Sequence, residues 1–593
     1  MRLFQKMTDE TKPQDKHTAI NELARRRGFF WQSYEIYGGA SGFVTYGALG
    51  TRLKQNIEKK LRELYVHKLG ILEIESPIIT PEKVFQASGH IEHFKEPMVE
   101  CQKCKKRFRA DHLITENTKT SQIDAEKLTL TELKDVIEKQ DISCPECGGQ
   151  FNPPKHFLTM FKTTIGPYSD AVGYGRPEAA QGIFVEFKRL YEQAREKLPF
   201  GVLQIGHALR NEISPRQGPI RLREFTICDL EFFFDPEEPD CYLLKDVQTT
   251  KLRLLLAEAR TKGSEKPVEA TVKEALQKGY VKNEWQAVFM ALATKLLTSL
   301  GVPADKQRFI EKHPWERAHY SLQTFDQEVL VERWGWVEVT AYAHRTDYDL
   351  KRHTEFSSQD MYVFKEHEKP VEKEQLIIKP VMAKLGPVFK KEAAKVVEMF
   401  SDADPKDVEA AFKKNGYFML GKHKILPEHV DIKREKTVER GRRFIPHVIE
   451  PTFGLDRLFY VAFEYAYQTK DDRTVLSFPR DIAPIQVGLY PLVSKDGLPE
   501  KAQELHKALL AEGFTVEYDE AGSIGRRYAR ADEAGIQLGI TVDYDTLKDN
   551  TITVRDRDSW KQVRSNVSNL HELLREYFLG KIGFEELGKP LES

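Results

Sequence analysis

The chain lacks a long apolar run and has no excess charge of either sign. No hydrophobic stretch approaches the ~20 residues that a membrane-spanning helix needs, and residues 1–16 are charged, without the apolar core of a signal peptide. Lysine and arginine together number 90, aspartate and glutamate 91, so any surface for nucleic acid must be a local patch. We therefore expect no membrane partner, a cytoplasmic protein, and a flexible N-terminus over residues 1–16.

Cysteine is also scarce, with six residues in the chain. Four of them stand in two Cys-x-x-Cys pairs: Cys101 with Cys104, and Cys144 with Cys147. Two thiolates at such spacing suit a tetrahedral zinc ion, and a second pair completes the four ligands. A disulfide or redox pair is the weaker alternative in a chain without a secretion signal. We expect a zinc ribbon-like insertion over residues 98–155, interrupted by the long charged segment between the pairs.

The length of 593 residues predicts several domains, because single cores stop growing near ~250–300 residues. Residues 235–315 and 365–440 are rich in charged residues and leucine at helical spacing, which predicts two helical insertions. Over residues 481–593, strand-like and helix-like segments alternate, which is typical of a mixed α/β domain. The main domain then spans residues 17–480.

Residues 207–234 predict two strands joined by a loop with arginines at both ends. With the period of two of a strand, Arg210 and Glu212 share one face of the first strand. One face of the second strand carries an aromatic ring and two carboxylates: Phe225, Asp229 and Glu231. Its other face is small or apolar: Thr226, Cys228, Leu230, Phe232 and Phe234. A solvated sheet face is the ordinary alternative, but the compact block of arginine, carboxylate and exposed phenylalanine favours a charged site above a core.

Two further segments place charges at strands. Residues 337–343 alternate as a strand, with Glu338, Thr340 and Tyr342 expected on one polar face and Arg345 just past the end of the strand. Residues 442–467 run from a strand into an amphipathic helix with Arg457 in its first turn, where the backbone dipole favours anions. An arginine near a helix start is usually a surface residue, so neither segment alone identifies a site.

Together these segments resemble the class II aminoacyl-tRNA synthetases. RNEISPR followed by RLREFT is similar to motif 2 in the form typical of glycyl-tRNA synthetases, and EPTFGLDR is similar to motif 3. RPEAAQG, from Arg176, is similar to the RPETAQG block of the glycyl family. A helical segment over 51–69 followed by a strand over 71–79 resembles motif 1, which builds the homodimer interface in that family. The last domain resembles the anticodon-binding domain shared with the histidyl, prolyl and threonyl enzymes.

The resemblance implies an α+β fold. Its parts are a class II antiparallel catalytic sheet flanked by helices, the zinc ribbon-like insertion, the helical insertions and a C-terminal mixed α/β anticodon-binding domain. The implied activity is that of a glycine–tRNA ligase: ATP-dependent attachment of glycine to the 3′ end of tRNA(Gly) through glycyl-adenylate, with Mg²⁺ accompanying ATP. Two alternatives are a non-catalytic synthetase-like paralogue that binds nucleic acid, and a synthetase for alanine or serine.

The resemblance also assigns site residues. It implies three catalytic residues: Arg210, Glu212 and Arg457. It implies an ATP-binding set: Arg210, Asn211, Glu212, Arg221, Leu222, Arg223, Glu224, Phe225, Glu338, Val339, Gly454 and Arg457. It implies a glycine-binding set: Glu178, Thr226, Asp229, Glu231, Arg345, Glu450, Thr452 and, with less support, Arg109. Glu338 would also hold the magnesium ion. The family usually has Glu where this chain has Asp229, and often Ser at Thr452.

Overall fold

The structure is a computed structural model that describes residues 15–120, 124–125, 127–167, 171–215, 217–400 and 403–591. The N-terminus expected to be flexible lies almost wholly outside these residues. The chain divides into two compact units: Met1–Met361 together with Pro446–Ser593, and Tyr362–Ile445. Across the described part of the chain, no helix combines the length and the apolar character needed to cross a lipid bilayer.

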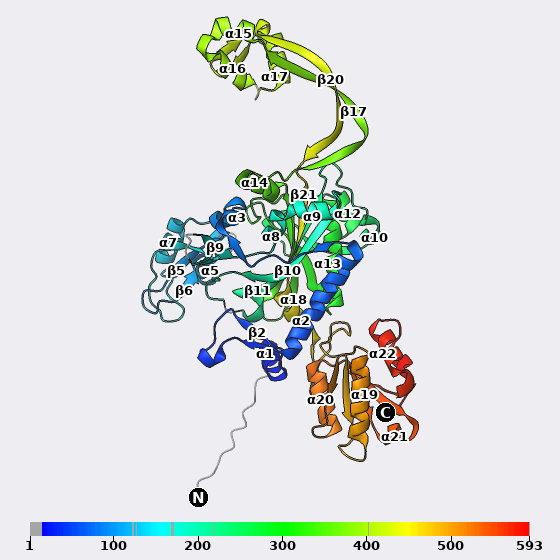
Figure 1. Ribbon diagram of the computed structural model, residues 1–593. Coiled ribbons are helices and arrows are strands. Elements are labelled where there is room, and N and C mark those ends of the chain that lie inside the picture. Colours follow the sequence, from blue (N-terminus) through cyan, green and yellow to red (C-terminus); the bar gives the residue numbers. More distant parts are fainter. Residues whose placement is uncertain are drawn as a thin grey trace. The chain divides into compact units, whose positions relative to one another are not determined.

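A nine-stranded sheet forms the centre of the first unit, in the order β13-β12-β14-β15-β16-β21-β11-β10-β3 (Figure 1). Its middle strands are β16 (Gly335–Thr346), β21 (His447–Gly454), β11 (Glu224–Phe234) and β10 (Phe200–Leu209). Each of these pairs antiparallel with the next, and the β10–β11 hairpin is the one predicted from residues 207–234. The sequence-based expectation of an antiparallel catalytic sheet is confirmed.

Three helices pack on one face of this sheet: α2 (Ala48–Leu61), α13 (Glu284–Ser299) and α18 (Leu455–Ala466). Their apolar side chains share one hydrophobic core with strand residues such as Leu230 and Phe453. The first turn of α13 is held by Asn283, whose side chain accepts a hydrogen bond from the Gln286 N–H. Because helices bury one face of the sheet, the charged residues of the central strands collect on the other.

The expectation of a helical insertion over residues 235–315 was wrong. Three of its segments are strands that extend the sheet: β12 (Lys251–Leu255), β13 (Val268–Thr271) and β14 (Gln307–Glu311). Its long helix is α13. The run KLRLLL at 251–256 is too short for its period to separate strand from helix. Pairing with β14, about fifty residues further along the chain, makes it a strand.

The cysteine-bearing insertion is a three-stranded sheet in the order β6-β5-β7. Its strands are β5 (Lys95–Glu100), β6 (Arg107–Arg109) and β7 (Lys155–Leu158). Two helices, α5 (Ala110–Asn117) and α7 (Leu130–Lys139), lie between the cysteine pairs and share a small core with them. α7 begins with a capping box of Thr129 and Glu132. The interrupted ribbon expected from the sequence is therefore present.

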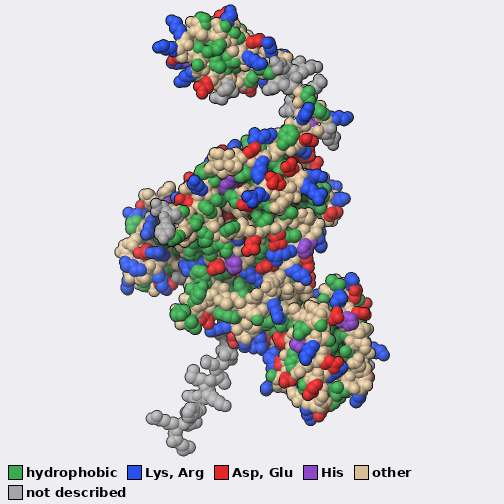
Figure 2. All heavy atoms as spheres, in the orientation of Figure 1, with side chains coloured by type: hydrophobic (Ala, Val, Ile, Leu, Met, Phe, Trp, Pro, Cys, Tyr) green, Lys and Arg blue, Asp and Glu red, His purple; other side chains and the backbone are tan. Residues whose placement is uncertain are grey.

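The second unit corresponds to the second insertion, expected over residues 365–440. Its stem is a long antiparallel ribbon of β17 (Val363–Pro380) and β20 (Val430–Phe444), which the sequence did not predict. Beyond the stem lie three helices and a small hairpin: α15 (Met382–Phe389), α16 (Ala393–Phe400), α17 (Pro405–Asn415), β18 (Phe418–Leu420) and β19 (His423–Ile425). These enclose a core of their own. In Figure 2, lysine and arginine side chains of this unit are scattered among hydrophobic ones on the visible face.

The C-terminal residues form the mixed α/β domain expected over residues 481–593. Six strands run in the order β25-β24-β26-β27-β28-β29. The central ones are β24 (Val487–Pro491), β26 (Leu538–Val542) and β27 (Thr551–Asp556). The helices α19 (Leu498–Ala511), α20 (Ile524–Ala534) and α22 (Leu570–Phe578) alternate with the strands. The core of the domain is separate from that of the nine-stranded sheet.

Candidate active site

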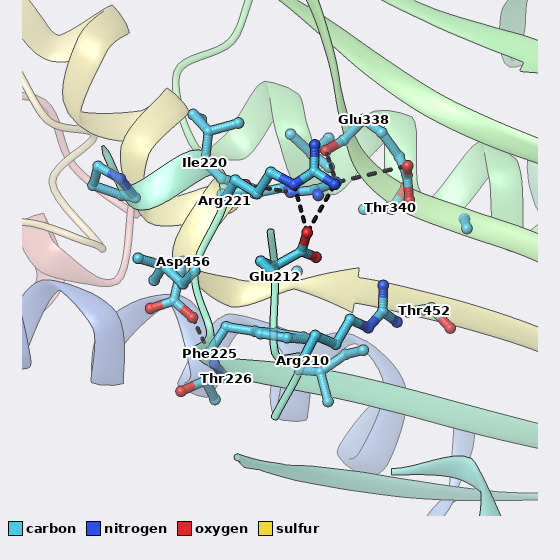
Figure 3. Close-up of a pocket in the computed structure, with 17 residues that line it drawn as sticks. Arg210, Glu212, Ile220, Arg221, Phe225, Thr226, Glu338, Thr340, Thr452 and Asp456 are labelled. Atoms are coloured by element: carbon cyan, nitrogen blue, oxygen red, sulfur yellow. Dashed lines mark hydrogen bonds and ion pairs between the residues drawn. The ribbon is translucent and has the colours of Figure 1, made fainter. Parts of the chain in front are cut away.

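A pocket opens on the free face of the nine-stranded sheet, where β11, β16, β21 and the start of α18 meet (Figure 3). Nine of the residues assigned to ATP line it: Arg210, Glu212, Arg221, Leu222, Phe225, Glu338, Val339, Gly454 and Arg457. Asn211, Arg223 and Glu224 lie in the same hairpin but do not line the pocket. Their contacts fit a supporting role, since Arg223 donates to the carbonyls of Glu212 and Ser41.

Three arginines from separate elements surround the pocket. Arg221 donates from Nε and Nη2 to the same oxygen of Glu212, each at 2.8 Å. Arg457 on α18 donates to the carbonyls of Ile220 and Glu338, at 3.0 and 2.8 Å. Arg210 donates from Nε to the Pro177 carbonyl and lies 5.4 Å from the centre of the Phe225 ring. Guanidinium groups converging from the two ends of the β10–β11 loop and from α18 make a site for a polyanion.

A β-bulge sets which side chains of β16 face this pocket. Thr340 is opposite Gln327 of β15 (Thr324–Val331), and Glu338 is opposite Glu328, so Val339 is an extra residue. Glu338 is exposed at the pocket, whereas the Thr340 hydroxyl bonds with the Gln327 side chain and Tyr342 hydroxyl inside the protein. The expected shared polar face of Glu338, Thr340 and Tyr342 was therefore wrong, because strict alternation does not anticipate a bulge.

Beyond the pocket, on the same face of the sheet, carboxylates gather around Arg345. This side chain is 1% exposed and holds Asp349 with Nε and Nη2, at 2.8 and 2.9 Å. Its Nη1 donates to Glu450 at 2.8 Å and its Nη2 lies 3.8 Å from Glu178. Arg345 thus lies within β16, not just past its strand as the sequence pattern indicated, and its guanidinium is already surrounded by carboxylates.

Several carboxylate oxygens of this acidic cluster have no partner. Among the described residues, Asp229 Oδ1 and both oxygens of Glu231 are buried without a hydrogen bond. Asp229 Oδ2 accepts the N–H groups of Ala179 and Ala180, at 2.6 and 3.1 Å. Unpaired buried carboxylate oxygens are costly, so the cluster is suited to receive a cationic group.

The titration of the cluster reflects its burial. Burial raises the pKa of Asp229 to about 6, and the nearby Glu178 adds to the shift. Burial also raises the pKa of Glu450 to about 8, against the opposing charge of Arg345. The pKa of Glu231 is raised well above its usual range by burial and by Glu450. For Glu178 burial acts upward, but His90 and Arg345 outweigh it and lower the pKa.

Two residues assigned to glycine lie elsewhere. The Thr226 hydroxyl accepts a hydrogen bond from Lys54 on α2, at 2.6 Å, because strand alternation turns this side chain to the helix-covered face. Arg109 lies on β6 of the cysteine-bearing insertion, where it contacts Glu96 and Asp111. Thr226 lines the arginine-lined pocket instead of joining the acidic cluster, and the contacts of Arg109 named here are within the insertion. Thr452, by contrast, lies opposite Asp229 in the sheet.

The sequence reasoning missed several residues of the site. His90 lies 3.2 Å from Glu178, and the Gln181 amide donates to both Glu178 and Asp349. Asp456, just before Arg457, accepts from Lys54 Nζ at 2.9 Å and from the Thr226 N–H at 2.5 Å. Its position next to a predicted arginine was the available signal. His90 offered none, because its partner lies far away in the sequence.

The four paired cysteines meet as expected. Their sulfur atoms all lie within 4.8 Å of one another, with Cys101 to Cys147 at 3.5 Å and Cys104 to Cys144 at 3.6 Å. A tetrahedral zinc with Zn–S bonds of ≈ 2.3 Å places sulfurs about 3.8 Å apart, so the residues fit this ion. A Cβ at Gly149 would lie 3.0 Å from Cys101 Sγ, and glycine permits this close approach. All six cysteines are free of disulfides.

Four arginines of the C-terminal domain, Arg527, Arg530, Arg555 and Arg557, have partners within the domain or are almost fully buried. Arg555 pairs with buried Asp532 at 2.8 Å, and Arg557 is 1% exposed. Arg527 is 2% exposed and donates to backbone carbonyls, while Arg530 pairs with Asp519. Charge spacing in the sequence does not separate such internal ion pairs from a nucleic-acid surface.

Several known proteins are similar to this chain over one domain or over nearly its full length. A model of the anticodon binding domain matches residues 486–577. The glycine–tRNA ligase of Aeropyrum pernix is 45% identical over 584 residues, 98% of this chain and 100% of that protein. Those of Pyrococcus horikoshii and Methanocaldococcus jannaschii are 45% and 44% identical, each over 95% of this chain and 99% of the relative. A solved prolyl-tRNA synthetase from Cryptosporidium parvum is 12% identical, with a TM-score of 0.49 over 95% of this chain and 76% of that one.

Proposed function

This chain belongs to the glycine–tRNA ligase family, and from that premise we propose that the arginine-lined pocket binds ATP and the acidic cluster binds glycine. The protein is a class II synthetase that attaches glycine to the 3′ end of tRNA(Gly) through glycyl-adenylate. The observation that carries the assignment of the two sites is their adjacency: Thr452 lines the pocket of converging guanidinium groups and lies opposite Asp229 of the buried, carboxylate-rich cluster.

In the first step, a carboxylate oxygen of glycine attacks the α-phosphorus of ATP and the bond to the bridging oxygen breaks, releasing pyrophosphate. The carboxylate is already a nucleophile, so catalysis depends on position and on charge stabilisation. Arg210 would hold the α-phosphate, with Phe225 beside the adenine. Arg221 and Arg457 would hold the outer phosphates. Glu338 offers the carboxylate ligand for Mg²⁺, which offsets phosphate charge when bound.

Selection of glycine would come from the acidic cluster. Glu178, Asp229 and Glu450 are buried close enough to influence one another's charge, and the substrate ammonium would compensate their excess negative charge. Asp229 Oδ2 accepts a backbone N–H group at the start of α8 (Ala180–Val185). Its Oδ1 has no hydrogen bond among the described residues and is therefore the oxygen available to the substrate ammonium. A rigid buried pocket excludes a larger side chain sterically.

Arg345 has a different role in this proposal from the one first assigned to it. The sequence resemblance gave it the glycine carboxylate. Its contacts with Asp349, Glu450 and the Tyr320 hydroxyl favour a role as a fixed counter-ion that orients Glu450. Glu212, held by Arg221, remains a candidate to orient the ribose of the tRNA 3′ end in the second step.

The assembly and location of the enzyme are also proposed. We expect a homodimer, as the resemblance to motif 1 implies, working in the cytoplasm. Ile36 and Tyr37 are 88% and 85% exposed near the start of α2, and apolar groups this exposed favour burial against another chain. Sedimentation should give about twice the 68.5 kDa mass of one chain. A monomer that charges tRNA would contradict the dimer.

The reaction is tested by glycine-dependent exchange of pyrophosphate into ATP. Purified protein should catalyse exchange with glycine, and alanine and serine should not replace it. Exchange supported equally by alanine or serine would overturn the glycine-selective cluster. Absence of any exchange from protein that still binds tRNA would favour a non-catalytic paralogue, which the relatives do not support.

A further inference from the structure

The cysteine-bearing insertion rests against the loop between β10 and β11. Ser214 in this loop donates to the Arg107 carbonyl of β6 at 2.6 Å, and the Asn211 N–H donates to the Thr159 carbonyl at 2.7 Å. Phe94, just before β5, lies 5.6 Å from the Arg210 guanidinium. The first part of the loop assigned to the triphosphate therefore contacts the insertion and the residues that flank it.

Glu96 on β5 links the insertion to the pocket. Its Oε1 accepts from Arg109 Nη1 at 2.5 Å and lies 3.8 Å from Arg221 Nη2. Its Oε2 is buried and makes no hydrogen bond among the described residues. One carboxylate thus lies between two guanidinium groups, one from the insertion and one from the pocket.

The other end of this chain of contacts is anchored. Asp111, with a side chain 1% exposed, binds both Nε and Nη2 of Arg109. If Arg109 turned away from Glu96, it would also give up its two contacts with the buried Asp111 carboxylate, which holds it in place. Burial and the positive charges of Arg109 and Arg221 lower the pKa of His112 to about 4, against the opposing charges of Asp111 and Glu212.

We propose that Glu96 and Arg109 are positioning residues for Arg221, through which the cysteine-bearing insertion sets the geometry of the pocket for the outer phosphates of ATP. The inference rests on the proposed function. Two guanidinium groups this close repel each other, and the shared carboxylate offsets that repulsion. Without the charge of Glu96, Arg221 is oriented by Glu212 alone. Neither residue contacts the acidic cluster, so the effect should fall on ATP and not on glycine.

The decisive experiment compares Glu96→Gln with Glu100→Gln in glycine-dependent pyrophosphate exchange. Glu100 is a matched control because it lies on the same strand and pairs with Arg107, whose side chain is 56% exposed. The KM for ATP should rise between about 3-fold and 30-fold in Glu96→Gln, with the KM for glycine unchanged. Glu100→Gln should resemble the wild type. A Glu96→Gln variant with the KM for ATP of Glu100→Gln would overturn the inference.

A second readout does not depend on turnover. Coupling between two sites is reciprocal, so ATP alone should slow the transfer of zinc from the protein to a chromogenic chelator. This protection should be present in the wild type and in Glu100→Gln but lost in Glu96→Gln; equal protection in all three would count against the inference.

If Glu96→Gln fails to fold, Arg109→Lys replaces it in both assays. Lysine keeps the positive charge at this position but lacks the planar guanidinium that can bind two carboxylates at once. A wild-type protein without exchange would refute the proposed function instead, so the two failures are distinguishable.

Discussion

At the scale of single residues, the charged groups and rings around each arginine guanidinium determine the role that it can have. Arg345 is enclosed by carboxylates and is fixed by them, whereas Arg210 lies over Phe225 at the wall of the pocket. The two side chains have the same chemistry in the sequence. Their different partners are the reason for proposing a counter-ion role for Arg345 and a phosphate-binding role for Arg210.

Replacing Arg210 should therefore impair the first step directly. We expect Arg210→Ala to lower the rate of pyrophosphate exchange about 10²- to 10³-fold, the cost of removing one preorganised donor. Arg189→Ala is the control, because that side chain is 82% exposed on α9 (Phe187–Gln193) and should leave the rate unchanged. An Arg210→Ala rate near that of Arg189→Ala would remove Arg210 from the mechanism.

The acidic cluster should make glycine use depend on pH. The ammonium of glycine binds the ionised carboxylates, and the pKa values of Asp229 and Glu450 are raised to about 6 and about 8. As the pH falls through these values, both groups gain protons and lose their attraction for the ammonium. The kcat/KM for glycine should rise with pH and level off above about 8. A profile that is flat between about pH 5.5 and 8.5, with folding retained, would contradict the assignment.

At the scale of elements, Asp456 ties three segments together. It accepts from Lys54 on α2, from the Thr226 N–H on β11, and from the Tyr46 hydroxyl at 2.5 Å. Arg457 is the next residue in the chain, so these contacts of Asp456 also fix the backbone position of Arg457. The helices behind the sheet thereby set the position of a side chain in front of it.

Breaking the ion pair of Lys54 and Asp456 should destabilise the first unit. The two side chains are 13% and 4% exposed, so Lys54→Met leaves a buried carboxylate without its cation and should cost about 3 kcal/mol. Lys59→Met on the same helix is the control, since Lys59 is 73% exposed and should cost less than about 0.5 kcal/mol. Urea unfolding of the two variants side by side measures the difference. Equal midpoints would contradict a stabilising role.

The cysteine cluster makes an element-scale prediction about metal. Protein purified without chelator should contain about one zinc per chain. Cys144→Ser should lower the metal content measured by atomic absorption, because three ligands hold zinc less tightly than four. Cys241→Ser serves as the control: Cys241 is buried in the main core, apart from the cluster. Unchanged zinc in Cys144→Ser would leave the site without support.

At the scale of the whole molecule, the catalytic pocket and the second unit belong to separate compact parts. Tyr362–Ile445 has its own core, and the ends of its stem, Val363 and Phe444, are paired in the ribbon. A short glycine linker can therefore join the flanking segments. We expect the protein without residues 363–444 to retain glycine-dependent pyrophosphate exchange, since every residue assigned to ATP and glycine lies in the first unit.

The excision is checked by comparing exchange with charging of tRNA. Exchange within about threefold of the full chain, with the melting profile of the first unit preserved, is the expected result. Loss of exchange from a shortened protein that still folds would show that the second unit contributes to the pocket.

Much of the candidate site could be predicted from the sequence, because the face on which a side chain lies depends on the local spacing of residues. Strand alternation placed Phe225, Asp229 and Glu231 on one face, and the two Cys-x-x-Cys pairs indicated their four-sulfur cluster before any contact was known. These patterns involve neighbours two or three residues apart, and backbone geometry alone orients them.

Tertiary structure decided what local spacing does not contain. The bulge at Val339 turns Glu338 toward the pocket, and pairing with β14 makes a strand of a run that resembles a helix. Glu96 and Arg221 meet although 125 positions separate them in the chain. Such outcomes depend on which distant segments pair and which charges are buried together. A periodic pattern specifies the face a side chain occupies, but only the packed fold supplies the partner it finds there.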